Sequence, residues 1–306
     1  MSIRIGTRGS DLALAQALAV QRDLEAMGEE TELVIVKTTG DLDLSQSFAD
    51  LGPAGVFAVE LRVALLSNEV DIAVHSAKDL PSQSPEGLVL AAAPERVAAH
   101  DRLLILPEHH DPSAKGVPLR EGATLGTAAA RRTALIKDMR PDLVIQTLRG
   151  NVPTRIRKLR EGEHDAILLA AAGLDRLQAS AGRGECDPPD LSGLVVHEMN
   201  PEEFTPAPGQ GAIAIEARGG DPAADVVAKL NDPSAKRCLD AERHVLSAVD
   251  AGCHTPFGAW CREVDPGLAM TAFMEVDGEL RWAGARGEDP EVLGAMVAGE
   301  LLGQEA

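Results

Sequence analysis

The sequence predicts two α/β units in tandem, each built on a mostly parallel sheet, followed by a small C-terminal α+β domain. Three observations support this fold class. Short apolar runs alternate with helical patterns from the first residues onward, the alternation starts again after the loop at residues 107–118, and the last part of the chain combines a long helix with strand-like runs. Such alternation is typical of βαβ units and parallel sheets.

The first unit begins with the strand-like run SIRIGT at residues 2–7. A helix is predicted next by apolar residues at helical spacing, namely Ala13, Ala17, Val20, Leu24 and Met27. ELVIVKT then predicts a second strand. Another amphipathic helix is marked by Phe57, Leu61, Ala64 and Leu65, and VDIAVHS at 70–76 has the continuous apolar character of a buried strand.

The second unit repeats this order. GATLGT leads into the helical run ARRTALIKDM, LVIQTL into TRIRKLREG, and DAILLAAAG into LDRLQ. GQGAIAIEAR adds a strand, and a helical region follows from about Pro222. In the tail, a helix has Cys238, Ala241, Val245 and Ala248 on one face. The runs GLAMTAFMEV and ELRWAGA are then joined by the short turn Asp277-Gly278, before a final helix to about Leu302.

Charge limits the classes of partner. The chain has 29 basic and 48 acidic residues and a net charge of -19, which argues against non-specific binding to nucleic acid or to an anionic membrane. From Gly126 to Arg160, however, nine basic residues face only two acidic ones. Such a local excess predicts a specific site for a small polyanion, and its plain alternative is a solvated helix face.

Composition also indicates in which cellular compartment the protein is expected. No apolar run approaches a membrane span or the core of a secretory signal. The four cysteines form no CxxC pair, so neither a disulfide scaffold nor a zinc site is predicted, and no metal is expected. A reducing, cytoplasmic location fits this pattern best.

Polar side chains follow the predicted strands at the edge where ligands bind in α/β sheets. Guanidinium groups there would bind carboxylates through paired hydrogen bonds, and a group of them would suit a ligand with several carboxylates. Phosphate is the rival ligand, although no GxxxxGK[ST] or GxGxxG motif accompanies them. Surface ion pairs are the plain alternative for each. The residues at these strand ends and helix starts are Arg8, Ser10, Ser76, Lys78, Asp79, Arg131, Arg132, Arg149 and Arg155.

The sequence alone does not decide the roles of two residues, Asp79 and Cys253. Asp79, directly after a buried strand, can stabilise a cationic intermediate and move a proton, or it can simply shape the turn before Pro81. Cys253 lies in the Gly- and Pro-bounded turn DAGCHTPFG, where a thiol can serve as a nucleophile or covalent anchor. A free cysteine is more often an inert buried residue.

A series of segments resembles, in order and over nearly the whole chain, the porphobilinogen deaminase (hydroxymethylbilane synthase) family of tetrapyrrole biosynthesis. One of these segments alone would be weak, whereas the ordered set is highly specific. They are IGTRGSDLALAQA, DIAVHSAKDLP, the ARR pair after GATLGT, RPDLVIQTLRGNVPTRIRKL, DAILLAAAGLDRL, PGQGAIAIEAR and AGCHTP.

The resemblance implies two periplasmic-binding-protein-like (type II) lobes and a third domain that carries the cofactor. In this chain we expect the first lobe at residues 1–95 plus about 212–229, the second at 96–211 and the third at 230–306. Relatives are typically monomers. The implied reaction joins four porphobilinogen molecules head to tail with loss of ammonia and releases hydroxymethylbilane by hydrolysis.

The resemblance also assigns residues. The cofactor, dipyrromethane, would be joined by a thioether to Cys253, and Asp79 matches the catalytic carboxylate that stabilises positive charge on pyrrole nitrogens. Cofactor binding is implied for Ser76, Lys78, Arg131, Arg132 and Arg155, and binding of porphobilinogen and oligopyrrole intermediates for Arg8, Ser10, Arg149 and Arg176.

Some positions depart from the family pattern. Ala54 and Val59 stand near positions where relatives commonly have lysines, and Ala128 and Ala129 where they commonly have serines. These departures bear on substrate affinity and turnover. The alternative hypothesis is therefore a catalytically weakened paralogue that acts as a cytoplasmic small-anion binding or sensor protein, although Asp79 together with Cys253 favours the enzyme.

Overall fold

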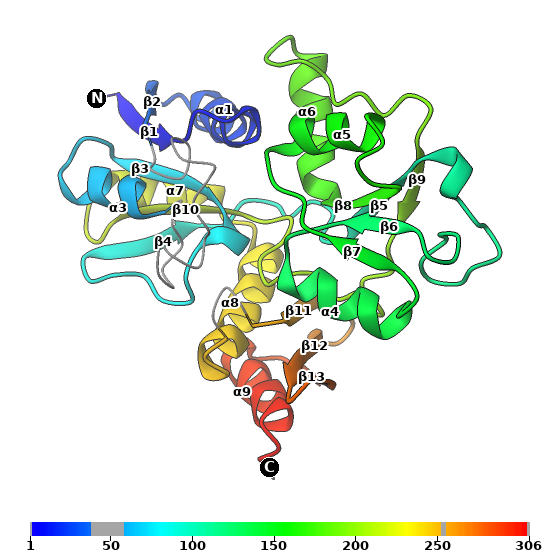
Figure 1. The fold of residues 1–306 in the computed structure, drawn as a ribbon. Coiled ribbons are helices and arrows are strands. Elements are labelled where there is room, and N and C mark those ends of the chain that lie inside the picture. Colours follow the sequence, from blue (N-terminus) through cyan, green and yellow to red (C-terminus); the bar gives the residue numbers. More distant parts are fainter. Residues whose placement is uncertain (1, 38–57, 252–254, 305–306) are drawn as a thin grey trace.

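Two α/β lobes stand side by side in the computed structural model, and a smaller third unit lies below both of them (Figure 1). The structure describes residues 2–37, 58–251 and 255–304. The predicted fold class is therefore confirmed. None of the described helices is both long enough and apolar enough to cross a membrane.

The first lobe is built on a five-stranded sheet in the order β2-β1-β3-β10-β4. Only β10 runs antiparallel to its neighbours, so the sheet is mostly parallel, as expected. Its elements are β1 (Ile3–Thr7), α1 (Asp11–Ala26), β2 (Thr31–Ile35), α3 (Val59–Leu66), β3 (Ile72–Ser76), the 3-10 turn η1 (Ala77–Asp79), β4 (Leu88–Ala92), β10 (Ile213–Arg218), α7 (Pro222–Val227) and η3 (Ala228–Leu230).

The second lobe repeats this plan with the order β7-β6-β8-β5-β9, in which only β5 runs against the others. Its apolar core is separate from that of the first lobe. Its elements are β5 (Asp101–Ile105), η2 (Pro107–His109), β6 (Thr124–Gly126), α4 (Ala130–Met139), β7 (Val144–Gln146), α5 (Val152–Arg160), β8 (Ala166–Ala170), α6 (Ala171–Gly182) and β9 (Val195–Glu198).

The third unit packs two helices on an antiparallel sheet in the order β11-β12-β13. The predicted turn between its last two strands is confirmed, because Asp277 and Gly278 both have positive φ, at 54° and 84°. Its elements are α8 (Pro233–Ala248), β11 (Phe257–Glu263), β12 (Leu268–Val276), β13 (Glu279–Gly287) and α9 (Pro290–Leu301).

Sequence patterns missed three strands, β4, β5 and β9. Two of them, β4 and β9, lie at sheet edges, and all three are runs of four or five residues. Runs this short do not separate a strand from a loop by periodicity. Two residues counted among the apolar positions of the predicted helices differ from that prediction. Ala248 is exposed at the end of α8, and Met27 lies just beyond α1 with 39% of its surface exposed.

The chain crosses between the lobes twice, at residues 93–100 and 199–212, and the two crossings lie against each other. The Val97 N–H donates to the Gly211 carbonyl at 3.3 Å. A side chain at Gly211 would bring its Cβ to 2.6 Å from the Val97 oxygen, and the φ of Gly211 is +88°. Only glycine therefore allows this close contact.

One buried carboxylate of the third unit holds both crossings. Glu242 of α8 is fully buried and accepts from the Gly209 N–H at 2.6 Å and from the Arg96 guanidinium at 2.7 Å. It also accepts from the Cys261 N–H of β11 at 2.7 Å. The third unit is thus attached to the connections between the lobes.

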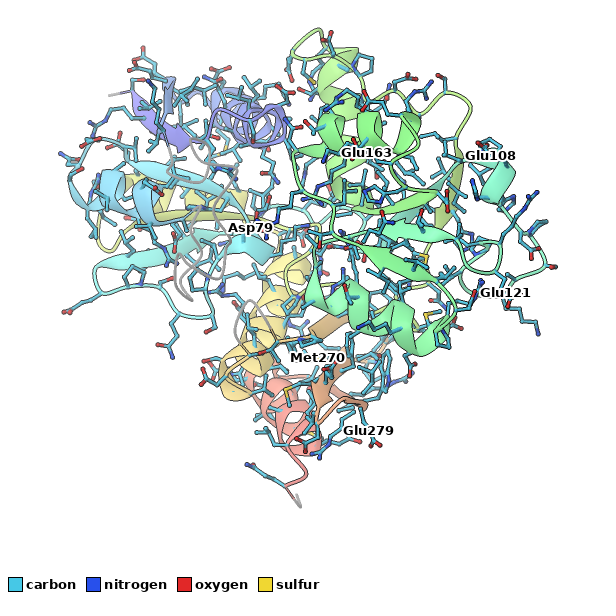
Figure 2. All side chains as sticks on the ribbon, in the orientation of Figure 1. Asp79, Glu108, Glu121, Glu163, Met270 and Glu279 are labelled. Carbon is cyan, nitrogen blue, oxygen red and sulfur yellow. The ribbon has the colours of Figure 1, made fainter. Side chains whose placement is uncertain are left out.

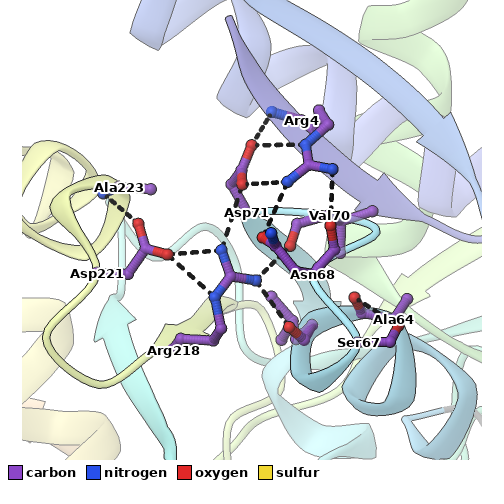
Figure 3. A network of polar contacts seen from close by, with 10 residues as sticks. Arg4, Ala64, Ser67, Asn68, Val70, Asp71, Arg218, Asp221 and Ala223 are labelled. Carbon is purple, nitrogen blue, oxygen red and sulfur yellow. Dashed lines mark hydrogen bonds and ion pairs between the residues drawn. The ribbon is translucent and has the colours of Figure 1, made fainter. Parts of the chain in front are cut away.

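A second buried carboxylate joins strands of the first lobe (Figure 3). Asp71 accepts from the backbone N–H of Arg4 at 2.8 Å and from its guanidinium at 2.7 Å, and from Arg218 of β10 at 3.3 Å. Burial acts to raise the pKa of Asp71, but the hydrogen bonds from the two arginines outweigh it and hold the pKa below its ordinary value.

We expect Asp71→Asn to lower the free energy of unfolding by about 2 kcal/mol at pH 7, because two arginines lose a charged acceptor. A carboxyl whose pKa is depressed in the folded state stabilises the fold above its unfolded pKa, and this contribution is lost as the pH falls through the folded-state value. Urea unfolding at pH 7 and at about pH 3 should therefore show that the free energies of unfolding of the wild type and Asp71→Asn converge in acid.

The exposed Asp138 of α4 offers a matched control, since Asp138→Asn should change stability by less than about 0.5 kcal/mol. An equal loss for Asp71→Asn at both pH values would contradict the role assigned to its charge.

Candidate active site

Asp79 stands at the carboxyl end of β3, at the edge of the first lobe that faces the second (Figure 2). The 3-10 turn that follows β3 is fixed from below by the buried side chains of Ala77 and Leu80. Gly209 packs against this turn so closely that a Cβ there would lie 2.9 Å from the Cβ of Ala77. The exposed Asp79 is therefore presented on a rigid base.

A cavity of about 80 Å³ beside Asp79 is bordered by three of the predicted residues, Arg8, Ser10 and Ser76. The Ser10 hydroxyl caps α1 by accepting from the Ala13 N–H at 3.4 Å. Ser76 is held by Gln16, whose Nε2 donates to the serine Oγ at 2.9 Å. Sequence patterns did not identify Gln16, a residue of α1 that is 3% exposed.

The second lobe presents the predicted arginine pair at the start of α4. Arg131 and Arg132 are each 6% exposed, and both donate to the fully buried Asp101 of β5, at 2.6 and 2.7 Å. Burial acts to raise the pKa of Asp101, but the two guanidinium groups overcome it and hold the pKa far below its ordinary value. One carboxylate between two arginines leaves a net positive charge.

Lys78 and Arg155 complete this cluster from opposite lobes. Burial lowers the pKa of Arg155 to about 10, with Arg132 acting in the same direction and Asp79 against it. Solvent reaches the Lys78 side chain, yet the protein around it displaces enough water to lower the pKa of its ammonium to about 8. Lys78 also interacts electrostatically with Asp79, Asp101 and both arginines of α4.

Two further predicted arginines, Arg149 and Arg176, belong to the second lobe. Arg176 of α6 donates to the Gly211 carbonyl at 2.8 Å, and burial lowers its pKa to about 10 against the opposing effect of Asp175. Arg149 is exposed in the loop that precedes α5, where Asn151 caps the helix by accepting from Thr154.

The basic run of α5 does not form one ligand-binding patch. Arg157 pairs with Glu161, Lys158 with Glu163 and Arg160 with Asp190. For these three residues the structure supports the plain alternative of a solvated helix face, and the resemblance assigns none of them to the site. Arg157, two positions after Arg155, points to another side of the helix. Lys158, three positions after Arg155, lies on the same side but is paired with Glu163.

The start of α4 adds backbone donors to the arginine pair. Within the described residues, no side chain caps this helix at Ala129, one of the two positions at which the family pattern led us to expect a serine. Uncapped first-turn N–H groups carry partial positive charge and bind anions. Ala128 and Ala129 therefore remove hydroxyl donors without removing the helix terminus.

Other predicted positions lie elsewhere or outside the described residues. Val59 begins α3 with 46% of its surface exposed. Cys253 and Ala54 lie outside the part of the chain that the structure describes. Among residues 2–37, 58–251 and 255–304, no group of three His, Cys, Asp or Glu side chains is arranged to hold a metal ion.

The charges of the site suit a ligand with several carboxylates. Lys78 and Arg155, from the two lobes, interact electrostatically with the exposed carboxylate of Asp79. The carboxylate of Asp101 is paired with Arg131 and Arg132. A dipyrromethane, which carries two acidic side chains on each ring, fits a site with this charge and donor set.

Comparisons with known proteins identify the family. The family model described as "Porphobilinogen deaminase, dipyromethane cofactor binding domain" matches residues 3–225. A porphobilinogen deaminase of Syntrophobacter fumaroxidans is 40% identical over 98% of this chain and 94% of its own length, and that of Rubrobacter xylanophilus is 41% identical over 97% and 93%. A probable porphobilinogen deaminase of Methanocella arvoryzae is 43% identical over 86% and 80%.

Among solved structures, the periplasmic VFT2 domain of Bordetella pertussis BvgS aligns with 75% of this chain and 86% of its own, at 14% identity and a TM-score of 0.41. The family match and the relatives each cover well over half of the chain. The chain belongs to the porphobilinogen deaminase family.

Proposed function

We propose that Asp79 is the catalytic carboxylate of this porphobilinogen deaminase and that the guanidinium groups facing it bind the carboxylates of the pyrroles. As a member of its family, the chain is a transferase that condenses porphobilinogen with loss of ammonia and uses a dipyrromethane cofactor. The observation that carries the proposal is the exposed carboxylate of Asp79, which interacts electrostatically with Arg155 of the other lobe, itself a neighbour of Arg132.

Charge explains why both lobes contribute. Each porphobilinogen brings an acetate and a propionate, so every addition increases the negative charge of the bound oligopyrrole. Arg131 and Arg132 retain one net positive charge after pairing with Asp101. Arg155 and Lys78 add one charge each, and the start of α4 adds neutral donors. Partly buried guanidinium groups bind carboxylates more strongly than exposed ones do.

Asp79 would act on the pyrrole nitrogens. When the aminomethyl group of porphobilinogen loses ammonia, positive charge develops on the ring, and a carboxylate that accepts from the pyrrole N–H stabilises it. The same carboxylate can take the proton lost when the new carbon–carbon bond forms. Dipyrromethane, when bound, supplies the free α-carbon that attacks the substrate.

The remaining assignments follow from the same match. We propose that Cys253 carries the cofactor through a thioether, that Ser76 and Lys78 contact the cofactor, and that Arg8, Ser10, Arg149 and Arg176 contact substrate. The three sheets support three domains at 1–95 with about 212–229, 96–211 and 230–306. We propose that the protein is a cytoplasmic monomer. We also propose that it has no nucleic-acid partner, because a net charge of -19 disfavours binding to a polyanion.

Intact-mass analysis tests the tether. The purified protein should be heavier than its polypeptide by one dipyrromethane, and Cys253→Ala should remove the excess mass. Cys186→Ala, which removes another free thiol, should leave it in place. A protein that gains no mass after incubation with porphobilinogen would instead support the anion-binding or sensor alternative.

Replacing Asp79 tests the chemistry. We expect Asp79→Asn to fold and bind porphobilinogen but to lose about a hundredfold or more in kcat, because the amide cannot accept the proton or balance the ring charge. Steady-state kinetics and a binding titration separate the two effects. Asp225→Asn, at an exposed position of α7, should be unaffected, and near-normal turnover of Asp79→Asn would refute the assigned role.

A further inference from the structure

A buried glutamine lies between the two halves of the site. Gln210 is 1% exposed and occupies the second crossing between the lobes. Its neighbours Gly209 and Gly211 have φ of +72° and +88°, and a Cβ on either would collide with the protein around it. The backbone on both sides of Gln210 is therefore held in one place.

Three partners fix the orientation of the Gln210 amide. Its Nε2 donates to the Ala99 carbonyl at 2.7 Å and to Asp101 Oδ1 at 3.0 Å. Both partners are acceptors, and only the NH2 end of an amide has two donors. Its Oε1 is thereby turned toward the first lobe, where it accepts from Lys78 Nζ at 3.5 Å.

This amide joins the cations of the two lobes through one short chain of contacts. Asp101, at one end, is the carboxylate that holds both Arg131 and Arg132. Lys78, at the other end, is the neighbour of Asp79 on the 3-10 turn. The carbonyl of Gln210 accepts from Arg96 Nε at 2.9 Å, so the backbone that carries the amide is fixed as well.

We propose that Gln210 is a positioning residue: it holds the Lys78 ammonium at a fixed place relative to the arginine pair, so that one pyrrole unit can be bound from both lobes at once. The inference rests on the proposed function. A neutral amide suits the place because a carboxylate there would repel Asp101, and an apolar side chain would leave the Ala99 carbonyl without its donor.

The environment of Lys78 provides a readout that does not need turnover. The charged groups around it are Asp79 on its own turn, Asp101 of β5, and Arg131 and Arg132 of α4, joined in the holoenzyme by the carboxylates of the cofactor. None of these groups is altered in the variants, so each variant is compared with the wild-type holoenzyme. Gln210→Met removes an acceptor from the ammonium, so the Lys78 pKa should fall below its value of about 8. Gln210→Glu brings a carboxylate to the same place, so the pKa should rise.

The test is the pH dependence of acetic-anhydride labelling of Lys78 in the holoenzyme, followed by mass spectrometry. We expect the midpoint to move down by about 0.5 pH unit in Gln210→Met and up by at least about that much in Gln210→Glu. In the same preparations, KM for porphobilinogen should rise about tenfold in Gln210→Met with a smaller change in kcat. Gln178→Met, at an exposed position of α6, should match the wild type in every measurement.

A role limited to packing predicts lower thermal stability without opposite shifts in labelling. Midpoints that stay at the wild-type value, or that move in one direction in both variants, would overturn the proposal even if the protein is an active deaminase. Opposite shifts in a protein without deaminase activity would instead refute the proposed function alone. If Gln210→Met does not fold, Gln210→Asn carries the same test, because the shorter amide cannot reach both Ala99 and Lys78, and its midpoint should also fall.

Discussion

The site depends on one ion-paired group, the fully buried Asp101 between Arg131 and Arg132. Two guanidinium groups at adjacent positions repel each other, and burying them costs free energy unless an opposite charge lies between them. Asp101 supplies that charge and still leaves one positive charge in excess. The arginine pair can therefore be held rigidly inside the protein and yet attract an anion.

Much of the fold was predictable because its signals are local. The alternation of apolar runs and helices identified the two lobes, and the pair Asp277-Gly278 identified a hairpin, since each pattern is set by neighbouring residues. Strands β4, β5 and β9 were missed because their pairing partners, not their own sequences, make them strands. The late return of β10 between β3 and β4 likewise depends on contacts far apart in the chain.

The site, like the fold, was predictable only in part. Asp79 and the arginines stand out in sequence because they follow strands, where ligands bind. Asp101, Gln16 and Gln210 gave no such signal, because a buried polar residue is recognisable only once its partners are known. In α5 the sequence left open whether Arg157, Lys158 and Arg160 bind an anion or lie on a solvated face, because their acidic partners are known only from the structure.

Glu242 has a mechanical consequence. Any rocking of one lobe against the other must turn about the two crossings, and Glu242 fastens both of them to α8 through Arg96 and Gly209. The two crossings, which act as the hinge between the lobes, are thus attached to the C-terminal unit. A cofactor attached to that unit would keep a constant distance from this hinge while the two lobes move. Its covalent link therefore need not stretch as the bound oligopyrrole grows.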